Sequence, residues 1–70
     1  MKKIFGERLL ELRHECGMSQ KELAKRLHIH QVTYMRYEKN YLEPSLEMLT
    51  DIAVFFGVSA DWLLGIENER

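Results

Sequence analysis

The chain has 70 residues, 46% of them hydrophobic and 30% charged, and a formal net charge of −1. This length excludes a second domain and a large core, and the single cysteine, Cys16, excludes an internal disulfide or a cysteine-based zinc cluster. We see no secretory leader and no run of about 18 apolar residues that could cross a membrane. We therefore expect a cytoplasmic protein with no membrane association.

The charges are distributed unevenly along the chain. Residues 1–41 carry nine Lys and Arg against five Glu, a net charge of +4, whereas residues 42–70 carry one Arg against six acidic residues, a net charge of −5. A basic half beside an acidic half is typical of a domain that docks on DNA. Chance segregation in a short chain is the alternative.

Residues 3–16 predict the first helix, because apolar side chains recur there at i, i+4, i+7 and i+11. The stripe consists of Phe5, Leu9, Leu12 and Cys16. On this face we expect a buried Cys16 thiol, with a redox-active thiol as the alternative.

Residues 19–38 predict two short helices joined by a tight turn, and the rest of the chain is organised around them. Ser19 and Glu22 form the S-x-x-E signature of a capping box at the start of the first of these helices. The apolar pattern breaks at residues 28–30 and resumes over residues 31–38.

Within residues 31–38, Tyr34 and Tyr37 are expected to face the core. The side chains expected to face outward are Gln31, Val32, Met35 and Arg36. Such side chains suit the major groove of DNA, because Gln can bond adenine N6 and N7, Arg can bond guanine O6 and N7, and Val can contact a thymine methyl group.

A fourth helix is predicted to begin at Pro44 or Ser45 and to end at Gly57, and a fifth to span residues 60–64. The fourth helix is expected to contribute Leu46, Leu49, Ile52, Ala53 and Phe56 to the core. Residues 67–70 are expected to fray.

The last third of the chain holds more apolar residues than a small core needs, which suggests contact with a second copy. The residues expected at this dimer interface are Phe55, Trp62, Leu63, Leu64 and Ile66. The alternative is that Trp62 and Leu63 close the end of the bundle within one chain.

The order of Gln20, Ala24, Leu27, Ile29, Tyr34 and Tyr37 resembles the helix-turn-helix of the phage-repressor/Cro and Xre-type transcriptional regulators. The resemblance covers about residues 4–65. It implies an all-α, five-helix, lambda-repressor-like DNA-binding domain over residues 1–70, with the helix-turn-helix at about 19–38. It also implies a buried ion pair between Arg13 and Glu38, with a surface pair as the alternative.

The same resemblance implies that Gln31, Val32 and Arg36 read the bases. Contacts to the DNA backbone, or support for the reading helix, are expected from Gln20, Lys21, His30, Thr33, Met35, Lys39, Asn40 and Tyr41. Backbone contacts position a protein on DNA without reading its sequence.

Three residues depart from the family pattern. His28 and Asn40 stand where the family usually has glycine, so both are expected to adopt positive φ. His30 replaces the usual Ser or Thr cap, which predicts a weak cap, with a pH-sensitive phosphate contact as the alternative. The spacing of His14, Cys16, His28 and His30 does not suit a metal, so we expect neither a metal site nor a cofactor.

These observations predict a sequence-specific regulator that binds double-stranded DNA, most simply a repressor acting as a homodimer on a palindromic operator. No nucleophile is arranged with a base and an orienting partner, so we expect neither an enzyme nor a small-molecule substrate. Two alternatives stay open: an antitoxin or immunity-type repressor that also binds a partner protein, and a protein–protein interaction module on the same scaffold.

Overall fold

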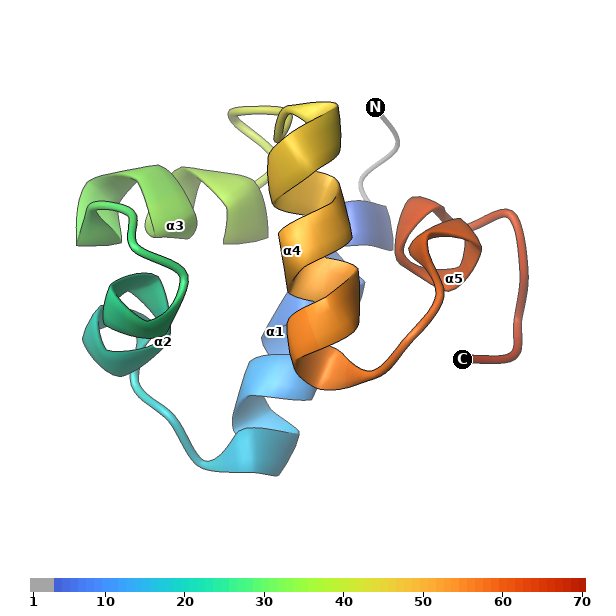
Figure 1. Cartoon of the computed structure of the whole chain (residues 1–70), viewed down its shortest axis with the longest axis horizontal. Helices are drawn as coiled ribbons and strands as arrows, with labels where there is room; N and C mark the ends of the chain where they lie inside the picture. The colour runs from blue at the N-terminus through green and yellow to red at the C-terminus, as the bar shows by residue number, and fades with distance from the viewer. Residues whose placement is uncertain (1–3) are drawn as a thin grey trace.

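The computed structural model describes residues 4–70, and within them it contains five α-helices and no strand. They are α1 (Ile4–Cys16), α2 (Gln20–Arg26), α3 (Gln31–Glu38), α4 (Leu46–Phe56) and α5 (Ala60–Leu64). Figure 1 shows α4 crossing in front of α1, with α2 and α3 on one side and α5 on the other. The predicted all-α, five-helix fold is confirmed, while the predicted start of the first helix at Lys3 lies outside the described residues.

One apolar core holds the helices together, with α3 packed against α1 and α2, and α5 packed against α1 and α4. Tyr34 and Tyr37 face inward as predicted, and the Tyr37 ring meets the Phe5 ring edge-on at 6.4 Å between centroids. The largest fully buried side chains are Tyr34, Phe5, Leu9, Leu23, Ile52 and Leu63. Burying one such side chain contributes about 1.5–3 kcal/mol, so a few of them decide the stability of a domain this small.

Serine side chains cap three of the helices. The capping box predicted for α2 is present, since Glu22 N donates to Ser19 Oγ at 3.0 Å and Ser19 N donates to the Glu22 carboxylate at 3.1 Å. Ser45 and Ser59 cap α4 and α5 through the serine contact alone, each Oγ accepting a hydrogen bond from a main-chain N–H three residues later. At the start of α3, His30 makes no side-chain cap hydrogen bond, which agrees with the weak cap predicted there.

The two predicted positive φ angles are present, at His28 (60°) and Asn40 (61°). At His28 this conformation ends α2 and turns the chain into α3. At Asn40 it ends α3 and also aims the side chain at α1, where Asn40 Oδ1 accepts a hydrogen bond from Gly6 N at 3.0 Å. A residue 34 positions away therefore caps the first turn of α1, which has free N–H groups.

Gly6 permits this approach because it has no Cβ. A Cβ atom at this position would overlap the carbonyl oxygen of Glu38 and the side chain of Asn40. The glycine lies inside α1, where it costs about 0.5–1 kcal/mol relative to alanine. The close packing of the end of α3 on α1 is the physical reason for it.

Two core predictions are wrong. The Cys16 thiol is exposed, because Cys16 is the last residue of α1 and the chain turns away at Gly17 without covering it. Leu46 is 84% exposed, because it begins α4 at the edge of the bundle, and the core receives Leu49, Ile52 and Ala53 instead.

The prediction that residues 67–70 fray is also wrong. The main-chain carbonyl of Arg70 accepts a hydrogen bond from Ser59 N at 2.9 Å, and the Arg70 guanidinium pairs with Glu11 and Glu15 on α1. The same guanidinium lies 4.8 Å from the centre of the Trp62 ring. Charge pairing and cation–π contact therefore return the tail to the bundle. Figure 1 shows the C-terminus folded back beside α5.

Candidate nucleic-acid interface

The outer face of α3 presents the three side chains predicted to read bases. Gln31, Val32 and Arg36 are all exposed, whereas Thr33 and Met35 are half-buried. The buried tyrosines of α3 pack beneath this face, so the exposed side chains stand on a helix whose position is fixed. An amide, a methyl surface and a guanidinium on one exposed helix face form a set that can distinguish bases in a major groove.

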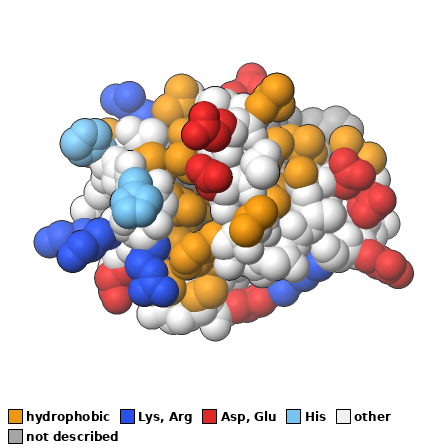
Figure 2. Space-filling model, viewed as in Figure 1, with side chains coloured by type: hydrophobic (Ala, Val, Ile, Leu, Met, Phe, Trp, Pro, Cys, Tyr) orange, Lys and Arg blue, Asp and Glu red, His pale blue; other side chains and the backbone are white. Residues whose placement is uncertain are grey.

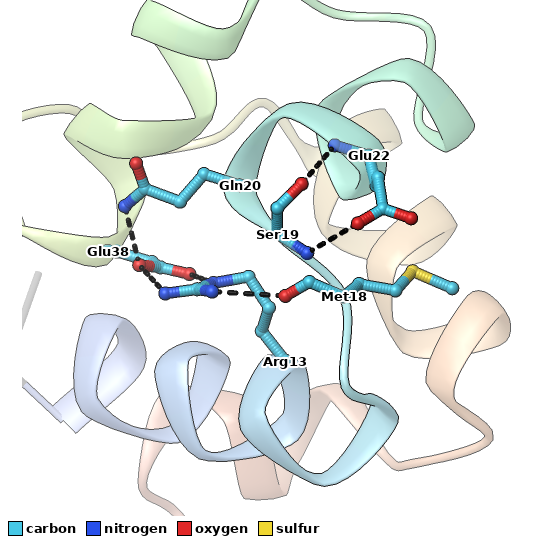
Figure 3. Close-up of polar contacts among 6 residues, drawn as sticks. All are labelled: Arg13, Met18, Ser19, Gln20, Glu22 and Glu38. Carbon is cyan, nitrogen blue, oxygen red and sulfur yellow. Dashed lines mark hydrogen bonds and ion pairs between the residues drawn. The ribbon is translucent and has the colours of Figure 1, made fainter.

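An ion pair at the end of α3 ties that helix to α1 (Figure 3). Arg13 Nε donates to Glu38 Oε2 at 2.6 Å and Arg13 Nη2 donates to Glu38 Oε1 at 3.2 Å. The Arg13 and Glu38 side chains are only 14% and 5% exposed, so this is the buried form of the pair rather than the surface form. Arg13 Nη1 also donates to the Met18 carbonyl at 3.1 Å, which joins the α1–α2 connection to the pair.

The surroundings of Glu38 keep it ionised. Burial alone would raise the pKa of its carboxyl group, but the hydrogen bonds from Arg13 and Gln20 outweigh burial and leave that pKa below its usual value. The hydrogen bond to Glu38 raises the pKa of Arg13 further above its ordinary range. Beside the pair, burial raises the pKa of the Tyr34 hydroxyl, so this tyrosine stays neutral.

Gln20, predicted to anchor a phosphate, has a structural contact that the sequence interpretation missed. Its Nε2 donates to Glu38 Oε1 at 2.9 Å, so the first residue of α2 holds the last residue of α3 (Figure 3). Asn40 is likewise occupied, because its side chain caps α1 through Gly6. Both residues therefore support α3 from within the chain. The one sequence signal for the Asn40 contact was Gly6, a glycine inside a predicted helix.

The other residues predicted to contact the DNA backbone lie on the surface around α3. Lys21 is exposed near the start of α2, His30 just before α3, and Lys39 and Tyr41 just after it. Figure 2 shows Lys, Arg and His side chains gathered over α2 and α3, with Asp and Glu predominating on the side of α5. The charge asymmetry of the sequence is thus also an asymmetry of this face.

The residues predicted for a dimer interface do not form one exposed patch. Trp62 and Leu63 are buried within the chain, which agrees with the alternative that they close the end of the bundle. Phe55 is half-buried and faces α2, with the Arg26 guanidinium 5.9 Å from the centre of its ring. Ile66 is 70% exposed and follows the half-buried Leu64.

Over residues 4–70, no three His, Cys, Asp or Glu side chains come together as ligands for a metal ion. Nor does any helix in that part of the chain have the length and apolar character needed to span a bilayer.

Residues 9–63 match a family described as helix-turn-helix, and this span includes α2, α3 and α4 in full. The chain is 38% identical over 61 residues to the HTH-type transcriptional regulator ImmR of Bacillus subtilis (strain 168), covering 87% of this chain and 48% of ImmR.

Two further relatives carry phage or prophage names. The SPbeta prophage-derived uncharacterized HTH-type transcriptional regulator YonR of Bacillus subtilis (strain 168) is 43% identical over 87% of this chain and 56% of its own length. The cryptic phage CTXphi transcriptional repressor RstR of Vibrio cholerae is 34% identical over 79% of this chain and 50% of its own. All three are named as transcriptional regulators or repressors rather than enzymes, and the chain spans about half the length of each.

Proposed function

The chain belongs to the Xre-type helix-turn-helix family, and we propose that it binds double-stranded DNA sequence-specifically through α3 and regulates transcription as a repressor. The observation that carries the proposal is the outer face of α3, where Gln31, Val32 and Arg36 are exposed together above buried tyrosines. Relatives named as regulators and as a phage repressor support the same function. This function would place the protein in the cytoplasm, with the DNA.

In this proposal Arg36 binds guanine O6 and N7, Gln31 binds adenine N6 and N7, and Val32 contacts a thymine methyl group. Lys21, His30, Lys39 and Tyr41 are placed around α3 to contact phosphates. We assign supporting roles to Thr33, Met35, Gln20 and Asn40, the last two through their contacts with Glu38 and Gly6.

We further propose that residues 1–70 act as a single DNA-binding unit and that two copies bind a palindromic operator with half-sites about 34 Å apart. The exposed Ile66 and the neighbouring Leu64 are the candidates for the contact between copies. A substitution of Ile66 by glutamate should then abolish dimers in sedimentation while leaving the fold intact. Wild-type protein that stays monomeric both free and on DNA would contradict this part of the proposal.

Selection of bound sequences from a random duplex pool tests the central claim. Wild-type chain should enrich one sequence, and its affinity should fall by orders of magnitude between low and moderate salt because phosphate contacts release counterions. An Arg36→Ala variant should lose preference at one base position, worth about 1–3 kcal/mol of discrimination.

Two matched variants sharpen this result. Arg36→Lys keeps the charge but removes the two-pronged contact, so it should retain affinity for random duplex while losing the base preference. Arg26→Ala removes an equal charge from another exposed site, at the end of α2, and should leave the preference unchanged. Salt-independent binding would favour a protein–protein interaction module instead. An Arg36→Ala variant that still enriches the wild-type sequence would refute the assignment of Arg36 to base reading.

A further inference from the structure

A surface groove runs between the end of α2 and the C-terminal half of α4. It consists of two hollows that share Arg26 and His28 in their linings. We call it the α2–α4 groove and define it by Met18, Lys25, Arg26, His28, Val54 and Phe55. It lies at the end of α2 opposite Gln20, the residue that binds Glu38.

The hollow on the α4 side has an apolar lining. Val54 is 76% exposed, Phe55 is partly buried against the core, and the buried Leu27 lines the same hollow. Figure 2 shows Lys, Arg and His side chains on the side of α2, and α4 lies at the centre of the same face (Figure 1). Hydrophobic side chains reach the surface between these two regions. An isolated exposed valine needs no explanation, but one beside a half-buried ring and an open hollow offers continuous apolar surface.

The two walls of the groove differ in charge. On the α2 wall, Lys25 and Arg26 form no ion pair within the described part of the chain, and Arg26 projects over the Phe55 ring. The acid on this wall, Glu22, has its carboxylate bound to the Ser19 N–H. On the α4 wall the lining residue with a charge is Asp51, which is exposed.

We propose that the α2–α4 groove binds an amphipathic α-helix of a partner protein. The apolar stripe of that helix covers Val54 and Phe55, its flank facing α2 carries carboxylates that meet Arg26 and Lys25, and its flank facing α4 carries a cation that meets Asp51. A helix laid in a groove is a common mode of peptide recognition. A helix presents a convex surface, which suits the two hollows of the groove.

The proposal goes beyond DNA binding and does not depend on it. A partner held at this end of α2 would give a regulator an input separate from its operator. The chemistry of the groove defines the partner as a helix with opposite charges on the two sides of one apolar stripe.

A display library of single helices tests this directly. Each member carries a fixed leucine stripe, and the positions on both flanks are randomised between Glu and Lys. Selection against the wild-type chain should enrich helices with Glu on one flank and Lys on the other. Selection against Arg26→Glu should reverse the enriched sign on the first flank, and selection against Asp51→Lys should reverse it on the second, because each substitution changes one wall only.

Val54→Asp serves as the affinity control, because Val54 is exposed and its replacement leaves the core intact. Selected helices should bind this variant at least tenfold more weakly than wild type, while both proteins give the same thermal melt. The Arg26→Glu variant should retain its operator preference in the duplex selection.

Three outcomes would overturn the proposal. The first is a selection that enriches no helix, or helices with the same sign on both flanks. The second is wild-type self-association that Val54→Asp abolishes, since the occupant would then be a second copy. The third is loss of DNA binding by Arg26→Glu as large as that caused by Arg36→Ala, since the groove would then belong to the DNA-binding surface.

Discussion

Replacing Arg13 by methionine should destabilise the chain by about 3–5 kcal/mol, because the Glu38 carboxylate would stay buried without its cation. Glu38 is 5% exposed, and after the substitution its remaining side-chain donor would be Gln20, at 2.9 Å. One hydrogen bond from a neutral donor to a charged group contributes about 1.5–3 kcal/mol and does not replace the lost charge pair. The pair also joins α1 to α3, so its loss should loosen the helix that carries the proposed base-reading side chains.

This loss is large relative to the total free energy of unfolding. A chain of 70 residues has a free energy of unfolding of about 4–10 kcal/mol at the usual value per residue. The Arg13→Met substitution should therefore remove between about a third and all of the free energy of unfolding. Glu38→Leu should cost a comparable amount, because it strands the Arg13 guanidinium at a site that is only 14% exposed.

The double variant separates a stranded charge from lost packing. Methionine and leucine together replace the buried pair by apolar side chains of similar size, which is often neutral or stabilising. We therefore expect the double variant to recover most of the stability lost in either single variant.

Urea unfolding followed by circular dichroism measures all four proteins of this double-mutant cycle. Gln20→Ala is the matched control, since it removes a neutral partner of the same carboxylate and should cost about 1.5–3 kcal/mol, less than the loss of Arg13. Single variants that lose less than about 1 kcal/mol would refute the reasoning, because that is the behaviour of a surface pair. A double variant whose loss equals the sum of the two singles would refute it equally.

Four further predictions concern single groups. Asn40→Gly keeps a residue suited to φ 61° but removes the cap on Gly6 N. It should lower the free energy of unfolding by about 1 kcal/mol in thermal or urea unfolding. Asn40→Asp should retain the cap. Gly6→Ala should destabilise by about 2–3 kcal/mol despite the better helix propensity of alanine, because its Cβ would overlap the Glu38 carbonyl; a neutral or stabilising result would contradict the observed packing. His28→Gly should stabilise by about 0.5–1 kcal/mol and leave the operator sequence unchanged, because glycine adopts positive φ without strain; a clear loss in thermal melts would reveal a contact made by the histidine. The pKa of Glu38 lies below its usual value of 4.5. The stability contributed by its ionised carboxylate is therefore complete above pH 4.5 and is lost as the pH falls through the lower pKa of the folded state. Acid titration of the wild type should show a steeper loss of stability than titration of Glu38→Gln.

Much of the fold could be predicted because its signals are local. A serine followed three residues later by glutamate caps a helix wherever it occurs, and the Ser19–Glu22 box is present as expected. The 3.6-residue period placed Tyr34 and Tyr37 inside. The same period failed at Cys16 and Leu46, because a helical stripe says which side faces the core but not whether the core extends to the end of the helix.

By itself the sequence determined the number and approximate limits of the helices and the side chains offered by α3, while the resemblance to the family indicated the two left-handed turns at His28 and Asn40. The helices and their exposed faces depend on neighbours a few residues apart, which a sequence displays directly. Only the tertiary structure decided that Asn40 caps α1, that Gln20 holds Glu38, and that the Arg70 tail returns to the bundle. Each of these contacts joins residues between 18 and 59 positions apart, and such pairs meet only after packing has brought the helices together.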